Sequence, residues 1–371
     1  MQSQKFEFQN VTIKENNLDV YNARKYPFKL YGLYKPEEEW LFRRMPTRIA
    51  NQVSEKVRAL HTNTAGARLC FRTDSLYIAV GAVYSPAELT APRTVILSGT
   101  GAYCFDLYAD GKFCSVMWPD KMIRNGSTAY FDIENEKYEA FYDFDEKKTR
   151  EITLYFPSFV NIESVYIGLQ EGCALEESSG YSNEKPIVFY GSSITQGACA
   201  SRVGNIYTNI LSRKLNLDYV NLGFAGAAKA EDVMIDYLCY MEMCALILEY
   251  DHNAKNVEYL KQTHYLLVEK VRSAHPDIPI ILMSRPNQSL GEEQTRLRVE
   301  VIKDSYRKRR NKGDLNIYFV SGQEIFSSQD ANIMTIDGTH PTDFGHYCIA
   351  QRLQKELERT SVTDVDEKTG N

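Results

Sequence analysis

Residues 186–197 have the sequence PIVFYGSSITQG, an apolar run followed by a turn in which two serines stand between glycines. The β-branched and aromatic residues of the run predict a short buried strand, and the spacing of residues 203–216 predicts a helix. A serine in a turn between a strand and a helix is often a simple helix cap. It also lies where open α/β sheets present reactive groups. The stretch therefore predicts an α/β sheet with a candidate nucleophile at its carboxyl edge.

The rest of the second half continues an alternation of strands and helices. Strands are expected at residues 187–190, 219–222, 245–249, 279–283 and 317–320, and helices at 255–273, 292–311 and 342–358. Strands that alternate with helical stretches predict a parallel sheet covered by helices on both faces, a three-layer α/β domain of flavodoxin-like type. We assign this domain to residues 181–360 and regard residues 361–371 as a polar tail.

The first half has period-two patterning instead. Short strands are expected at residues 67–72, 76–83, 93–97, 102–108, 127–133, 151–156 and 164–169. So many short strands, separated by turn signals, predict a β-sandwich of jelly-roll type over residues 1–180, with a linker at 176–185. Trp40 and Trp118 both lie in this half, where a place in the core is favoured over stacking on a sugar ring.

A second polar segment, Asp-Gly-Thr-His at residues 337–340, supplies what a serine nucleophile needs. A serine hydroxyl attacks poorly until a base takes its proton, and an imidazole such as His340 is suited to that task near neutral pH. Asp337 precedes His340 by three residues, so a tight turn would let its carboxylate accept a hydrogen bond from the second ring nitrogen. The sequence thus contains a candidate Ser-His-Asp system.

The chain resembles the SGNH (GDSL-type) hydrolases in four segments that occur in the order of that family. Residues 191–194 resemble the Gly-Asp-Ser-Leu/Ile block, and Ile194 with Thr195 sets the register so that Ser193 falls at the nucleophile. Residues 218–226 resemble the glycine block, residues 250–254 the asparagine block, and residues 337–340 the Asp-x-x-His block. The resemblance implies that Ser193, Asp337 and His340 are catalytic. It also implies an oxyanion hole formed by the backbone N–H groups of Ser193 and Gly226 and the side-chain amide of Asn253.

Two of the four blocks depart from the family pattern. Ser192 replaces an aspartate that usually braces the nucleophile turn, so the polar network of this turn must differ. The asparagine block lacks the usual glycine before Asn253 and the aspartate after it, and Asp251 is a candidate replacement for that aspartate. Asp251 and His252 can either contact substrate or hold the loop. Each site residue also has a purely structural interpretation: Ser193 as a helix cap, Gly226 as a turn glycine and Asn253 as a strand-end cap.

Composition excludes several classes of function. A chain of 371 residues with a net charge of -6 has no basic surface pattern typical of nucleic-acid binding. Its first residues lack the pattern of a secretory signal, and no apolar run reaches membrane-spanning length. The eight cysteines are scattered and form no Cys-x-x-Cys pair, so we expect no metal or cofactor and a cytoplasmic, reducing location.

A β-sandwich before an SGNH-like domain resembles the two-domain carbohydrate esterases and related acylhydrolases. The resemblance implies a serine esterase that removes a small acyl group, acetyl above all, from a carbohydrate. The expected partner is then a small-molecule or oligosaccharide ester, and a homo-oligomer is compatible with the sequence. One alternative is a lipase, lysophospholipase or thioesterase that acts on longer acyl chains. Another is a carbohydrate-binding or scaffold protein that has lost activity.

Overall fold

The computed structural model describes residues 6–9, 13, 16–85, 96–119, 137–285, 291–326 and 331–363. Within these ranges the chain forms two compact units. The first unit comprises Met1–Arg44, Thr62–Thr94 and Ala102–Gly180, and the second comprises Met45–His61, Val95–Gly101 and Tyr181–Asn371. The second unit therefore includes two segments from the first half of the sequence.

The first unit is a β-sandwich, as the period-two patterning predicts. Among its described residues, one antiparallel sheet has the order β1-β9-β4-β7 (Leu18–Asn22, Ile162–Gln170, Tyr77–Tyr84 and Tyr138–Asp143). The other has the order β10-β3-β8-β5-β6 (Leu175–Glu176, Arg68–Thr73, Arg150–Tyr155, Phe105–Ala109 and Lys112–Met117), with β2 (Lys29–Tyr31) paired to β3. Alternate residues of both sheets share one buried cluster, which is the core of the unit.

The second unit contains a parallel sheet whose order fixes where a site can form. Its strands run β12-β11-β13-β14-β15 (Tyr219–Gly223, Ile187–Gly191, Ala245–Glu249, Ile280–Met283 and Ile317–Val320). In chain order this is 2-1-3-4-5, the flavodoxin-like order, so the predicted three-layer α/β fold is confirmed. Connections leave β11 and β13 in opposite directions, and ligands bind at such a switch point outside the carboxyl ends of the strands.

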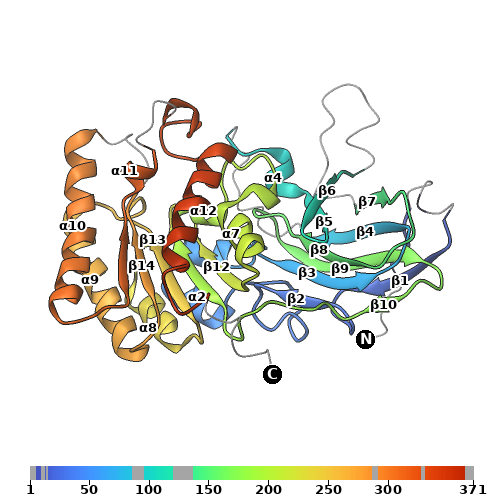
Figure 1. Ribbon diagram of the computed structural model, residues 1–371, viewed down its shortest axis with the longest axis horizontal. Coiled ribbons are helices and arrows are strands. Elements are labelled where there is room, and N and C mark those ends of the chain that lie inside the picture. The colour runs from blue at the N-terminus through green and yellow to red at the C-terminus, as the bar shows by residue number, and fades with distance from the viewer. Residues whose placement is uncertain are drawn as a thin grey trace. The chain divides into compact units, whose positions relative to one another are not determined.

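Helices cover both faces of this sheet (Figure 1). One face packs against α8, α9 and α10 (Asp232–Tyr240, Val257–Ala274 and Glu292–Asn311). The other packs against α7 and α12 (Tyr207–Leu215 and Asp343–Leu357). Shorter elements lie in the connections, namely α6 (Ser193–Gln196), η1 (Val203–Asn205), α11 (Gly322–Ile325) and η2 (Ala331–Ile333). The strands are buried on both sides, which explains why each is an almost continuous apolar run.

Two helices in the first half were not predicted, and the assignment of that half to strands alone was wrong there. They are α2 (Thr47–Val53) and α3 (Glu55–Leu60), and they bury side chains in the core of the second unit. Ile49, Val53, Val57 and Leu60 recur at helical spacing, and the Ser54 side chain caps α3 by accepting from the Val57 N–H. The helical signal was therefore present in the sequence, although it is only two turns long in each helix.

Two smaller expectations also differ from the structure. The strand expected at residues 102–108 begins only at Phe105, because α4 (Gly99–Tyr103) occupies the residues before it. The strand expected at 127–133 and most of the one expected at 93–97 lie outside the described residues. The expectation that both tryptophans are buried was wrong, since Trp40 is 69% exposed and Trp118 42% exposed.

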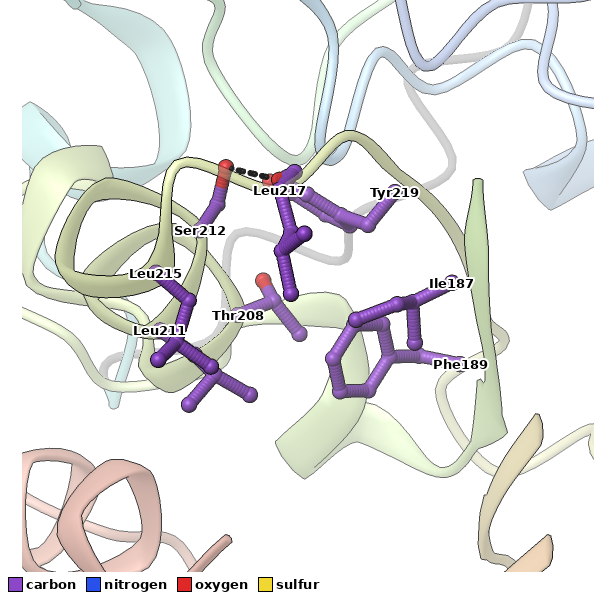
Figure 2. Close-up of a pocket in the computed structure, with 8 residues that line it drawn as sticks. All are labelled: Ile187, Phe189, Thr208, Leu211, Ser212, Leu215, Leu217 and Tyr219. Carbon is purple, nitrogen blue, oxygen red and sulfur yellow. Dashed lines mark hydrogen bonds between the residues drawn. The ribbon is translucent and has the colours of Figure 1, made fainter. Parts of the chain in front are cut away.

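A gap between α7 and the sheet belongs to the core. Figure 2 shows Phe189, Thr208 and Leu217 pointing toward it, and Ser212 donating a hydrogen bond to the Leu217 carbonyl over 2.7 Å. The lining is almost wholly apolar, and the gap leaves no space for a water molecule. It adjoins the first residues of β11, whereas the nucleophile turn follows the last, so it is a packing defect away from the candidate site.

Two properties of the whole chain bear on its setting. All eight cysteines carry free thiols. In the part of the chain that the structure describes, no helix combines the length and apolar character needed to cross a bilayer.

The close approach of β12 to α6 gives a test of the fold. A Cβ atom on Gly223 would lie 2.2 Å from the Gln196 nitrogen, and backbone cannot move aside as a flexible side chain can. We therefore expect Gly223→Ala to lower the free energy of unfolding by about 1–3 kcal/mol, the usual cost of overpacking. Urea unfolding measures it. Gly99→Ala is the control, because a Cβ there meets no atom within 4 Å, and an equal loss in both variants would contradict the packing argument.

Candidate functional site

The turn that carries the candidate nucleophile, residues 191–197 (the nucleophile turn), begins where β11 ends. Ser192 is the N-cap of α6, and its hydroxyl accepts a hydrogen bond from the Ile194 N–H over 3.1 Å. Ser193 is the first residue of the helix, so its backbone N–H belongs to the helix terminus, where donors have no partner within the helix. Gly197 ends the helix with φ of 107°, a conformation that glycine adopts at little cost. This geometry leaves Ser193 at the carboxyl edge of the sheet and only half-buried.

A second turn holds the carboxylate and the imidazole. The Asp337 carboxylate accepts from the backbone N–H groups of Thr339 (2.9 Å) and His340 (2.8 Å), which closes the turn on itself. Gly338 lies at its tip with φ of 77°. The chain then pairs Thr335 with Pro341 and enters α12. The three-residue spacing thus brings the two side chains together through a tight turn, as the sequence predicts.

The structure brings the three residues into one hydrogen-bonded chain. Ser193 Oγ lies 2.9 Å from His340 Nε2, and His340 Nδ1 lies 2.8 Å from Asp337 Oδ2. If Nδ1 carries the proton and donates to Asp337, Nε2 is free to accept from the serine hydroxyl. Partial burial pushes the pKa of Asp337 upward, but hydrogen bonds from the N–H and ring of His340 outweigh it and leave that pKa below its usual value. Asp337 is thus ready to stabilise a protonated imidazole.

The glycine segment packs directly against α6. The Phe224 N–H donates to the Gly191 carbonyl (2.9 Å), and the Ala225 N–H donates to the Gln196 side chain (3.0 Å). The chain then turns at Gly226, which is exposed and has φ of 66°. A Cβ atom at this position would lie 2.7 Å from Nζ of Lys56, a residue of α3. The exposed glycine therefore has an ammonium group beside it that the sequence did not point to.

Asn253 lies in the loop after β13, beside the glycine segment. Its backbone N–H donates to the Tyr250 carbonyl (2.9 Å), and its Nδ2 donates to the Phe224 carbonyl (3.1 Å). An amide nitrogen carries two hydrogens, so this bond leaves a second donor. The hydrogen bond to Phe224 therefore holds the Asn253 side chain against the segment that contains Gly226.

A buried carboxylate that the sequence analysis did not single out lies under the nucleophile turn. Glu249, the last residue of β13, is 1% exposed, and its carboxylate accepts from the hydroxyls of Ser192 (2.8 Å) and Thr195 (2.9 Å) and from the Ser192 N–H (3.2 Å). Burial above all, and then the charge of Asp251, raises the pKa of Glu249 to about 7. The only sequence signal is an acidic residue at the end of a wholly buried apolar strand.

A second polar group lies next to Glu249. His252 Nε2 is 3.6 Å from Glu249 Oε1, and Arg285 Nη2 donates to His252 Nδ1 over 2.8 Å. Arg285 Nε also lies 3.7 Å from Asp251 Oδ2, and Arg298 donates to the Asp251 carbonyl. Burial is the main reason that the pKa of His252 lies well below its usual range, and Arg285 lowers it further. Both residues left open in the sequence, Asp251 and His252, thus contact protein groups that hold the loop.

Glu249, Asp251 and His252 are also the one group among the described residues with possible metal-ligand atoms within 4.8 Å of one another. The donor set does not suit a cation. Arg285 brings a fixed positive charge to two of the three residues. Because Nδ1 of His252 accepts from Arg285, Nε2 carries the ring proton and has no lone pair to offer a metal.

Two sequence models match the chain and between them cover most of it. Residues 184–358 match the GDSL-like lipase/acylhydrolase family, and residues 18–175 match the N-terminus of SGNH hydrolase-type esterases. No curated protein is similar enough in sequence to match.

Solved structures resemble the chain over nearly its whole length. A GDSL-like lipase candidate from Bacteroides ovatus shares 25% identity at a TM-score of 0.78, covering 92% of this chain and 98% of that one. The salicylyl-acyltransferase SsfX3 of a tetracycline biosynthetic pathway shares 18% identity (TM-score 0.73, 92% and 97% covered). A family two carbohydrate esterase from Clostridium thermocellum, solved with cellohexaose, shares 16% (TM-score 0.59, 80% and 93% covered). The last two likenesses show a common fold. Both halves of the sequence match models of one type of enzyme, and the chain belongs to the GDSL-like acylhydrolases, the SGNH family of carboxylic ester hydrolases.

Proposed function

We propose that this protein is a serine esterase that removes a small acyl group, acetyl in the first instance, from a hydroxylated substrate of the carbohydrate class. The observation that carries the proposal is the chain of two hydrogen bonds from Ser193 through His340 to Asp337, at 2.9 and 2.8 Å. A nucleophile, a base and a group that orients the base are thereby within reach of one another before any substrate binds.

The proposed reaction has two stages. Ser193 Oγ attacks the ester carbonyl carbon while its proton passes to His340 Nε2, and the resulting imidazolium is stabilised by Asp337. The tetrahedral intermediate then collapses, the bond between carbonyl carbon and alcohol oxygen breaks, and His340 returns the proton to the departing alcohol. In the second stage water takes the place of the serine hydroxyl, releases the carboxylic acid and restores Ser193.

The negative oxygen of the intermediate needs donors that already face it. We assign these to the backbone N–H groups of Ser193 and Gly226 and to the second amide hydrogen of Asn253. Support comes from the position of Ser193 at the start of α6 and from the bond by which Asn253 is held to Phe224, two residues before Gly226. The first amide hydrogen fixes the side chain, and the second is left for the substrate.

The substrate class rests on two supports. The fold is shared with family two carbohydrate esterases, one of which was solved with cellohexaose. In addition, Lys56 Nζ lies next to the position of Gly226, where an ammonium with three donors could bind hydroxyl oxygens of a sugar.

A series of p-nitrophenyl esters tests the reaction and the acyl length together. We expect kcat/KM to be highest for acetate, lower for butyrate and lowest for octanoate, because the proposal assigns a small acyl group. Release of acetate from an acetylated oligosaccharide, followed by chromatography, tests the alcohol side. A rate that rises with chain length would overturn the acetyl assignment.

A specific feature favours a second candidate, an ester with a larger apolar group. Several apolar side chains in the segment around Asp337 and His340 are exposed, namely Ile333, Ile336, Phe344 and Tyr347. An apolar acyl or alcohol group would cover part of them on binding. The octanoate arm of the series decides between the two candidates.

Substitution of each serine in turn tests which of the two is the nucleophile. Ser193→Ala should abolish turnover of p-nitrophenyl acetate, because Ser193 supplies the one hydroxyl that is bonded to His340 Nε2 among the residues that the structure describes. Ser192→Ala is the matched control and should leave a folded enzyme with activity within about tenfold of wild type, since its hydroxyl caps α6 and does not attack. If Ser192→Ala is inactive while Ser193→Ala still turns over substrate, the assignment of the nucleophile is wrong.

Asn253 and Asn256 make a matched pair for testing the oxyanion donor. Asn256 caps α9 by accepting from the Tyr259 N–H, so Asn256→Ala should cost about 1 kcal/mol of stability and leave kcat unchanged. Asn253→Ala should instead lower kcat by about two to three orders of magnitude with little change in KM, because the bond forms mainly in the transition state. Melting temperature and steady-state kinetics of both variants provide the comparison. An active but destabilised Asn253→Ala variant would exclude this donor.

A further inference from the structure

The Glu249 carboxylate holds the nucleophile turn at more than one point. Its Oε2 accepts from the Ser192 N–H, the Ser192 hydroxyl and the Thr195 hydroxyl, and its Oε1 lies 3.0 Å from the Ser192 hydroxyl. The backbone carbonyl of Glu249 also accepts from the Ser192 N–H over 2.9 Å. These contacts bracket Ser193, since one partner precedes it directly and the other follows two residues later.

The Glu249 carboxylate lies beside position 192, where the sequence departs from the family's first block. The block that residues 191–194 resemble has an aspartate at the position of Ser192, whereas the turn of this chain carries no carboxylate there. Ser192 is short and uncharged, and its hydroxyl points to the carboxylate on the neighbouring strand. Parallel pairing places Gly191 opposite Glu249, so the side chain that follows Gly191 starts beside that carboxylate.

We propose that Glu249 is the positioning residue of the nucleophile, and that it supplies from β13 the carboxylate that the turn itself lacks at position 192. The inference rests on the proposed function and deepens it. The hydrogen bonds of the Glu249 carboxylate in the nucleophile turn go to Ser192 and Thr195, so it acts through these residues and not on the reacting atoms.

The effect on catalysis follows from the geometry. Ser193 Oγ must stay 2.9 Å from His340 Nε2 and in line with the ester carbonyl. The helix that presents it, α6, is only four residues long and is too short to be stable on its own, so its position depends on contacts with neighbouring elements. A displacement of about 1 Å of a reacting group can cost on the order of 100-fold in rate. A buried carboxyl group that accepts hydrogen bonds from several donors of the turn limits such displacement.

Four proteins test the proposal by changing where the carboxylate lies. Wild type has one carboxylate, at position 249. Glu249→Gln has none but keeps the side-chain volume. Ser192→Asp has two that face each other, and the double variant Ser192→Asp/Glu249→Gln has one, moved to the turn. The readouts are kcat and KM for p-nitrophenyl acetate, the rate of covalent reaction with a fluorophosphonate, and the melting temperature.

We expect the two proteins with a single carboxylate to be the active ones. Glu249→Gln should lose about 10- to 100-fold in kcat with KM nearly unchanged, because the turn is loosened and binding is not. Ser192→Asp should also lose activity, since two buried carboxylates repel each other. The double variant should recover most of the loss of either single variant, which a purely structural role of Glu249 does not predict.

The inference is overturned if Glu249→Gln keeps kcat within twofold of wild type. It is also overturned if the double variant is no more active than Ser192→Asp, a comparison that remains valid should Glu249→Gln fail to fold. Wild type that reacts with neither the ester nor the fluorophosphonate overturns the proposed function as well. Glu356→Gln removes another buried carboxylate, paired with Arg352 in the last turns of α12 and with Arg359 just after that helix, and should leave kcat unchanged.

Discussion

The pairing of Gly191 with Glu249 is the constraint on which the site depends. These residues lie opposite each other where the parallel strands β11 and β13 end. A Cβ atom on Gly191 would lie 2.1 Å from the Thr195 hydroxyl and 2.6 Å from the Glu249 carbonyl, so only glycine lets the chain turn back over its neighbour. From that point the chain delivers Ser192 to the carboxylate of Glu249 and Ser193 to the open edge.

The two acids of the site lie in opposite surroundings. Asp337 is partly exposed (36% of its side chain), is held by backbone N–H groups and has a lowered pKa. Glu249 is fully buried, is held by hydroxyls and has a pKa raised to about 7. A buried carboxylate is costly unless it is well bonded, and this one is retained beneath the turn where several donors converge. Exposure therefore distinguishes Asp337, the acid that we propose orients the base, from Glu249, the acid that we propose positions the turn.

The sequence predicted the α/β fold well because its strands are buried on both faces. Runs such as residues 187–190 and 245–249 cannot be confused with surface helices, and each coincides with an observed strand. The approach of His340 to Ser193 could also be foreseen, since a family pattern fixed both positions. Glu249 could not, because a single acid at a strand end has no distinguishing pattern. Lys56 could not, because it lies about 170 residues from Gly226 in the sequence, and only tertiary packing brings them together.

Helices α2 and α3 come from an early part of the chain, and the core of the second unit depends on their buried side chains. Met45, Ala50, Val57 and Leu60 are buried in the same core as Leu222 and Met234. The two sequence models that match the chain meet near residue 180, yet the packing of the second unit crosses that border. Recombination that exchanged everything before the border would also replace these helices, and with them the ammonium beside Gly226. The sequence of the early segment is therefore expected to vary together with the core residues of the second unit that it contacts.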